Sequence, residues 1–91
     1  MREEIALLAD VQAALERGDG AKALTRLDGH VTTDRQLLAE RSAARILALC
    51  LLGRDTEARR AALVFMHAHP ASVQRTAVER SCAGTKKSGE R

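Results

Sequence analysis

Apolar side chains recur along this chain at the three- and four-residue spacing of helices, and nowhere do they alternate as in a strand. In the first segment Ile5, Leu8, Val11 and Leu15 form one stripe that Leu7 and Ala14 widen, and charged residues can remain in water. Ala, Leu, Arg and Glu, all strong helix formers, dominate the composition. The pattern therefore predicts an all-α domain over residues 1–83, with helices over about 2–17, 20–31, 34–52, 55–69 and 72–82.

One turn occurs twice at the same point of the helical pattern. Gly18 and Gly53 are 35 residues apart, and so are Ala23 and Ala58. A repeat of about this length, with a glycine turn before a small alanine, is typical of stacked helical hairpins. The predicted hairpins cover about residues 2–31 and 34–69, and residues 72–82 form a capping helix.

Capping residues predict where these helices begin and end. Glycine ends the first and third helices, because it readily adopts the left-handed conformation that closes a helix. Pro70 ends the fourth, since the residue before a proline is pushed out of the α region. The predicted N-terminal caps are Asp19, Thr33 with Gln36 as a capping box, Asp55 and Ser72.

The third predicted helix is apolar on nearly every face, so we expect it at the centre of the fold with neighbours on both sides. In the fourth helix, small residues form a narrow seam that Phe65 closes. The fifth helix is expected to turn Val73, Ala77 and Val78 inward and to cover the second hairpin. The residues expected to face the core from the third and fourth helices are Leu37, Ala44, Leu47, Ala48, Leu51, Ala58, Ala61, Ala62 and Phe65.

The net charge of +3 conceals an asymmetry between two parts of the chain. Residues 1–34 carry four basic and seven acidic side chains, whereas residues 35–91 carry eleven basic and five acidic ones. The arginines are interspersed with acids along helices, which is more typical of a solvated surface than of a groove that follows phosphates. Nucleic-acid binding is therefore only the second alternative function. The polar, glycine-rich residues 84–91 are expected to be disordered.

The sequence contains no stretch that approaches the ~20 apolar residues needed to span a bilayer. The N-terminal residues mix acids with leucines and have no cleavage-site pattern, so no signal peptide is predicted. As written, the chain is expected to be cytoplasmic. As a fragment of an anchored protein, it would be periplasmic.

These features together resemble the tetratricopeptide repeat family. Ala58 and Pro70 match the small residue and the closing proline of that repeat, and Ala23 followed by Leu27 matches its small-to-large step. The chain departs from the pattern at Arg35, where the first unit would close on proline, and it lacks the aromatic signature of the first helix. The resemblance implies an α-α superhelix, a right-handed stack of two hairpins plus a C-terminal capping helix, and it identifies no ligand.

Residues 40–54 and 65–72 resemble a narrower group, the degenerate tetratricopeptide domains of bacterial envelope proteins. Domains of that group often follow a single membrane anchor and face the periplasm. The resemblance therefore implies an alternative function, a structural or self-association domain of a membrane-anchored bacterial envelope protein.

Residues that could carry chemistry are few and dispersed. Of the three histidines, His30 stands alone, and His67 and His69 are two positions apart on a predicted helix. They point ~200° away from each other and cannot chelate one metal ion together. Residues 18–20 lack the Lys-Ser/Thr pair of a phosphate loop, and a thiol in apolar company, as at Cys50, is protonated and inert. No catalytic residue, metal site, cofactor or small-molecule substrate is therefore predicted.

Cys50 and Cys82 leave two interpretations open. Both could be buried thiols that pack as small apolar residues. Alternatively, the third and fifth helices of such a stack run parallel with the two sulfurs at nearly the same height, within reach of a disulfide if both side chains point inward. A disulfide would need an oxidising compartment.

Binding through shape is the function that remains, and we predict a non-catalytic protein–protein interaction module of the scaffold or adaptor type. In the tetratricopeptide family, the first helix of each hairpin lines the concave face. By position, the resemblance implies a partner-binding surface of Ile5, Leu8, Gln12, Leu15, Glu16, Glu40 and Ala43, continued by Leu47 and Cys50. Two hairpins are fewer than the three repeats that usually form a stable stack. The apolar flank of the first hairpin is therefore expected to be open to another protein or to a second copy of the chain.

Overall fold

Five helices make up the part of the chain that the computed structural model describes, residues 2–29 and 35–84. This part contains no strand, which confirms the predicted all-α fold class. The predictions for His30, for the capping residue Thr33 and for residues 85–91 lie outside it. The helices are α1 (Arg2–Glu16), α2 (Gly20–Asp28), α3 (Arg35–Leu51), α4 (Asp55–Ala68) and α5 (Arg75–Arg80).

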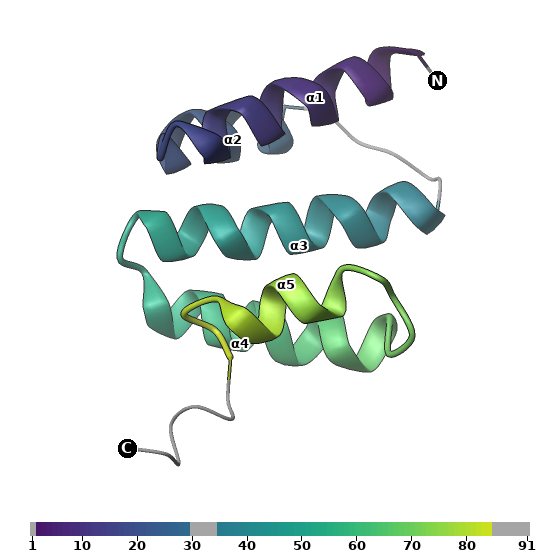
Figure 1. The fold of residues 1–91 in the computed structure, drawn as a ribbon, viewed down its shortest axis with the longest axis vertical. Helices are drawn as coiled ribbons and strands as arrows, with labels where there is room; N and C mark the ends of the chain where they lie inside the picture. The colour runs from purple at the N-terminus through teal and green to yellow at the C-terminus, as the bar shows by residue number, and fades with distance from the viewer. Residues whose placement is uncertain (1, 30–34, 85–91) are drawn as a thin grey trace.

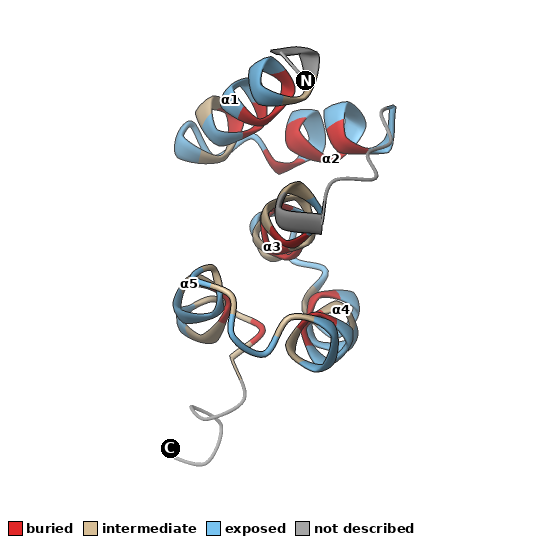
Figure 2. Cartoon of the chain, turned by 90° about the vertical axis from the view of Figure 1, so that its right-hand side faces the viewer, coloured by how far each residue is buried: buried red, intermediate tan, exposed pale blue. Residues whose placement is uncertain are grey.

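The third helix, α3, lies at the centre of the fold. α1 and α2 lie on one side of it and α4 and α5 on the other, and α3 contacts each of these four helices (Figures 1 and 2). Neighbours on both sides explain why its apolar residues are spread around most of its circumference, as predicted. The prediction is wrong for Leu51, which is 47% exposed. The buried residues of α3 are Ala39, Ala43, Ala44, Ile46, Ala48 and Leu49.

The two hairpin turns have the same backbone conformation. Gly18 and Gly53 both have a φ of +76°, which glycine adopts without steric cost. In each turn the glycine N–H donates to the carbonyl three residues earlier and the next N–H to the carbonyl five residues earlier, at 2.8–3.0 Å. This pair of bonds is the Schellman motif. Ala23 and Ala58, at equivalent positions after the turns, are both fully buried, so the repeat seen in the sequence is present in the backbone.

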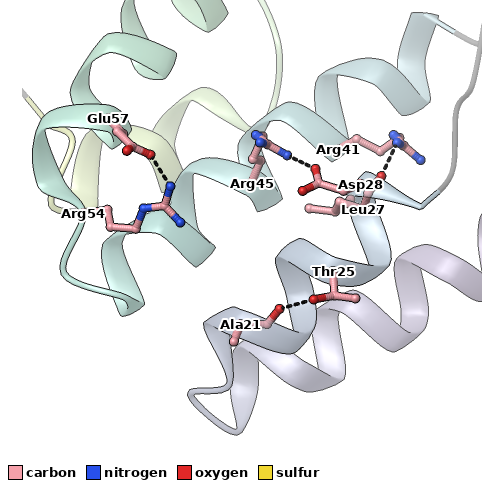
Figure 3. Close-up of polar contacts among 8 residues, drawn as sticks. All are labelled: Ala21, Thr25, Leu27, Asp28, Arg41, Arg45, Arg54 and Glu57. Atoms are coloured by element: carbon pink, nitrogen blue, oxygen red, sulfur yellow. Dashed lines mark hydrogen bonds and ion pairs between the residues drawn. The ribbon is translucent and has the colours of Figure 1, made fainter.

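The caps of the second helix of each hairpin differ. Asp19 caps α2 as predicted, because its Oδ1 accepts a hydrogen bond from the Lys22 N–H at 3.0 Å. The predicted cap at Asp55 is wrong, since Arg54 occupies the N-cap position of α4 and Asp55 is the first helical residue. Arg54 Nη2 instead donates to Glu57 Oε1 at 2.7 Å (Figure 3).

The last helix is shorter than predicted, because α5 begins at Arg75 and Ser72 is not its N-cap. Ser72 Oγ accepts a hydrogen bond from the Gln74 N–H at 3.0 Å. This local bond stabilises a turn in the segment that the sequence pattern predicts as the start of the helix. Val73, predicted to face inward, lies in that turn and is 88% exposed. Val78 is fully buried, as predicted.

The buried side of α1 is narrower than the predicted stripe and lies within it. Ile5 is 60% exposed and Leu15 is only half-buried. Since α1 contacts both α2 and α3, its buried residues face the line where those two helices meet (Figure 2). These residues are Leu7, Leu8, Val11 and Ala14.

Arginines of α3 bind the C-terminal end of α2 (Figure 3). Arg41 Nη2 donates to the Leu27 carbonyl oxygen at 2.9 Å, and Arg45 forms an ion pair with Asp28. The last carbonyl groups of a helix have no partner inside it and carry partial negative charge, so both contacts are favourable. They fix the first hairpin on the second.

Gly20, the first residue of α2, marks a close approach between two helix backbones. A Cβ atom placed on it would lie 2.7 Å from the Ala48 carbonyl oxygen and 3.0 Å from Leu51 Cβ, both on α3. The carbonyl belongs to a helical backbone and cannot rotate away as a side chain would. The missing side chain at this position therefore lets α2 start directly on the end of α3.

Replacing Gly20 with alanine should destabilise the domain. We expect the free energy of unfolding to fall by about 1–3 kcal/mol, the usual cost of overpacking, in urea denaturation followed by circular dichroism. Gly29→Ala is the matched control, because the nearest atom to a Cβ there is Thr25 O at 3.5 Å, an ordinary contact. Equal stability of the two variants would contradict the close approach.

Candidate functional site

Large apolar side chains that remain exposed are prominent on the second hairpin. Leu63 and Val64 on α4 are 65% and 69% exposed, although Ala58, Ala62 and Phe65 on the other side of the same helix are buried. Figure 2 shows that α4 lies at the edge of the stack, with one side toward α3 and the other toward solvent. A pair of adjacent apolar side chains on the open side of a helix marks a surface for interaction.

The predicted partner-binding residues are divided by their exposure. Leu8 and Ala43 are buried and cannot meet a partner in this conformation. The expected apolar opening of the first hairpin is also reduced, since Ile5 is the one large apolar side chain of the described part of α1 and α2 that is exposed. Ile5, Gln12 and Glu16 are exposed, and Leu15, Glu40, Leu47 and Cys50 are partly buried.

The outward side of α4 forms a surface that we name the α4 outer face. It consists of Thr56, Arg60, Leu63, Val64 and His67, all of which are exposed. Residues three, four and seven positions apart share one side of a helix, so these side chains are neighbours. The face has an apolar centre with a basic residue before it and a histidine after it.

The sequence analysis missed this face, although a signal for it was present. Leu63 and Val64 fall on the side of the helix opposite the seam that Phe65 closes, where a surface helix normally carries polar residues. Large apolar residues on that side indicate a second apolar surface of the helix, which another element or a partner would bury.

A shallow groove runs along each edge of α4. The groove between α3 and α4 has a volume of about 270 Å³, and Val64, Phe65 and Arg45 are among its lining residues. The groove between α4 and α5 has a volume of about 160 Å³ and is bordered by Leu63 and Met66. Both are smaller than the ~300–1,000 Å³ of typical small-molecule sites, so each suits single side chains of a partner rather than a whole small ligand.

The surface around the α4 outer face is basic. The side chains of Arg59, Arg60 and His67 form no hydrogen bond or ion pair within the described part of the chain. Glu57, an acid near the start of the same helix, is already paired with Arg54. The positive charges of Arg59 and Arg60, which are not compensated within the described part of the chain, attract acidic groups on a partner.

Both cysteines and His69 take part in structural contacts. In residues 2–29 and 35–84, no three His, Cys, Asp or Glu side chains converge as metal ligands. Neither cysteine offers a thiol for nucleophilic chemistry, because both are oxidised. His69 packs against Phe65, with ring centroids 5.5 Å apart. The arrangement provides shape, apolar surface and charge.

Cys50 on α3 and Cys82 just after α5 are joined by a disulfide, with Cα atoms 5.6 Å apart. The structure thus contains the covalent arrangement, one of the two that the sequence left open. The bond ties the end of α5 to the central helix, while Val78 and Ala83 next to it are buried in the core. A six-residue helix is thereby held against the second hairpin.

Comparisons with models of protein families, with curated proteins and with solved structures gave no match to this chain. None of the helices in the described ranges combines the length and hydropathy needed to cross a bilayer. Evidence for a function therefore comes from the surface of the molecule itself.

Proposed function

We propose that this chain is a non-catalytic protein–protein interaction module, built from two helical hairpins of the tetratricopeptide type and a short C-terminal cap. The two glycine turns, which have the same backbone conformation, support the hairpin stack. So do the two buried alanines, Ala23 and Ala58, each of which lies five residues after its turn glycine. The packing of α3, the first helix of the second hairpin, against α1 and α2 also agrees with such a stack. In this class of fold the stack is a scaffold and the ligand is another protein.

The observation that carries the proposal is the exposure of Leu63 and Val64. Burying one such side chain contributes roughly 1.5–3 kcal/mol, so two of them on one helix turn supply a binding centre. Each borders a groove that a partner's side chain can enter. The unpaired Arg59 and Arg60 beside them select an acidic or mixed acidic-apolar partner segment.

The disulfide favours a periplasmic setting over a reducing one, because such bonds persist in oxidising compartments. This agrees with the likeness of residues 40–54 and 65–72 to envelope domains. We propose the envelope as the compartment in which this module acts.

A photo-crosslinking amino acid at position 64 tests the module. We expect the irradiated chain to yield a covalent adduct with a second protein, which mass spectrometry identifies. Leu63→Glu in the same chain should abolish the adduct. In a titration of the purified pair, Leu63→Glu should weaken binding roughly 10- to 100-fold, the equivalent of ~1.5–3 kcal/mol.

The same crosslinker at Val73 is the control. Val73 is more exposed than Val64 but lies outside the α4 outer face. An adduct of equal yield from position 73, or one that Leu63→Glu leaves unchanged, would count against the α4 outer face as a binding surface.

A further inference from the structure

The two ends of the stack carry opposite charge. Residues 2–29, which contain α1 and α2, have six acidic and four basic side chains, whereas residues 35–84 have four acidic and eight basic ones. α1 and α2 lie at one end of the longest axis of the molecule, and α4 and α5 lie at the other (Figure 1). The chain is therefore acidic at its first hairpin and basic at its second.

The acidic end has an outward surface that matches the α4 outer face in size. Ile5, Ala9, Gln12 and Glu16 are all exposed and follow one another at four- and three-residue spacing, so they form a single stripe along α1, named here the α1 outer face. Ile5 is its one large apolar side chain. The charged residue of this face is Glu16, and Asp10, elsewhere on α1, forms an ion pair with Arg26 of α2.

We propose that the partner of the α4 outer face is a second copy of this chain, which docks through its own α1 outer face in a head-to-tail arrangement. Ile5 of one copy packs against Leu63 and Val64 of the other, and the acidic first hairpin of one copy then faces the basic second hairpin of the other. This inference rests on the proposed function and names its partner.

Charge selects this pairing over the two symmetric ones. A contact between two α4 outer faces would bring together the basic ends of both copies, with Arg60 on each face, and a contact between two α1 outer faces would bring together their acidic ends. Like charges placed opposite each other disfavour an interface, whereas opposite charges speed the encounter and fix the register. The unlike faces therefore pair.

The α1 outer face and the α4 outer face of one copy cannot contact each other. They lie at opposite ends of the stack, with the central α3 between them (Figure 2). Each head-to-tail contact leaves one α1 face and one α4 face free at the ends of the pair. Such a heterologous contact continues into longer chains or closes into a ring.

Sedimentation equilibrium of the oxidised full chain tests the proposal. We expect the weight-average mass to rise above 9.9 kDa with concentration. The rise should diminish as salt increases from ~0.1 M to ~1 M, because the Debye length shortens from ~10 Å to ~3 Å. Ile5→Arg and Leu63→Glu each reverse the character of one face, and each variant should remain at the monomer mass.

An equimolar mixture of the two variants gives the decisive measurement. Ile5→Arg keeps an intact α4 outer face and Leu63→Glu keeps an intact α1 outer face, so the mixture should associate above the monomer mass although neither variant does so alone. Val73→Glu, which changes an exposed apolar residue outside both faces, should associate as the wild type does. Circular dichroism and thermal unfolding verify that each variant is folded.

Three outcomes would overturn the inference. They are a wild-type chain that stays monomeric at every concentration, a mixture that stays monomeric, and single variants that associate unaided. The proposed function is judged separately, because an adduct formed at position 64 with a different protein would support the interaction module while excluding a second copy as its partner.

Discussion

Phe65→Ala is expected to lower the free energy of unfolding by roughly 3–5 kcal/mol, the usual cost of removing a buried phenylalanine ring. Phe65 is 2% exposed and is the largest fully buried side chain among the described residues. It closes the seam of small residues on α4 and packs against the His69 ring. A domain of this length has a total stability of only ~5–14 kcal/mol, so the loss should appear as a fall of at least ~12 °C in the thermal midpoint.

The matched control is Leu63→Ala, which truncates an equally apolar residue two positions earlier on the same helix. Since Leu63 is 65% exposed, its truncation should change stability by no more than ~0.5 kcal/mol. If the two alanine variants unfold at the same temperature, Phe65 is not the packing centre of the second hairpin.

Reduction of the Cys50–Cys82 disulfide should lower the free energy of unfolding by about 3.5 kcal/mol, the chain-entropy value for closing a loop of this length. A small all-helical domain with a single large ring in its core depends strongly on such a cross-link. Thermal unfolding of the oxidised and reduced chains measures the difference. The reduced chain should also be about 2 Da heavier, because each sulfur gains a hydrogen.

The double variant Cys50→Ala with Cys82→Ala supplies the control for reduction. It should unfold at the lower temperature and should not respond to reductant. A wild-type chain whose mass and unfolding temperature are both unchanged by reductant would show that the disulfide does not form in solution.

The sequence predicted well those features that local chemistry determines. Glycine at positions 18 and 53 and aspartate at 19 act through their own backbone and nearest neighbours, so the turns and the α2 cap could be derived without knowing the rest of the fold. The seam of Ala58, Ala62 and Phe65 also follows from helical periodicity alone.

Features that depend on competing contacts were harder to predict. Ser72 can cap a helix or hold a turn, and the choice of the turn shifted the start of α5 and exposed Val73. Which residues of the apolar stripe of α1 are buried depends on where α2 and α3 meet, and this contact leaves Ile5 exposed. The α4 outer face was not predicted because the seam of Ala58, Ala62 and Phe65 already accounts for the packing of that helix, and periodicity alone does not show that Leu63 and Val64 stay exposed.

All four other helices pack on α3. Loss of α1 and α2 would therefore expose one side of α3 to water, and loss of α4 and α5 would expose the other. Long repeat arrays can melt piece by piece, since each unit adds its own increment of stability. In this molecule the other helices all pack on one central helix, α3, so the domain should fold and unfold in one all-or-none step.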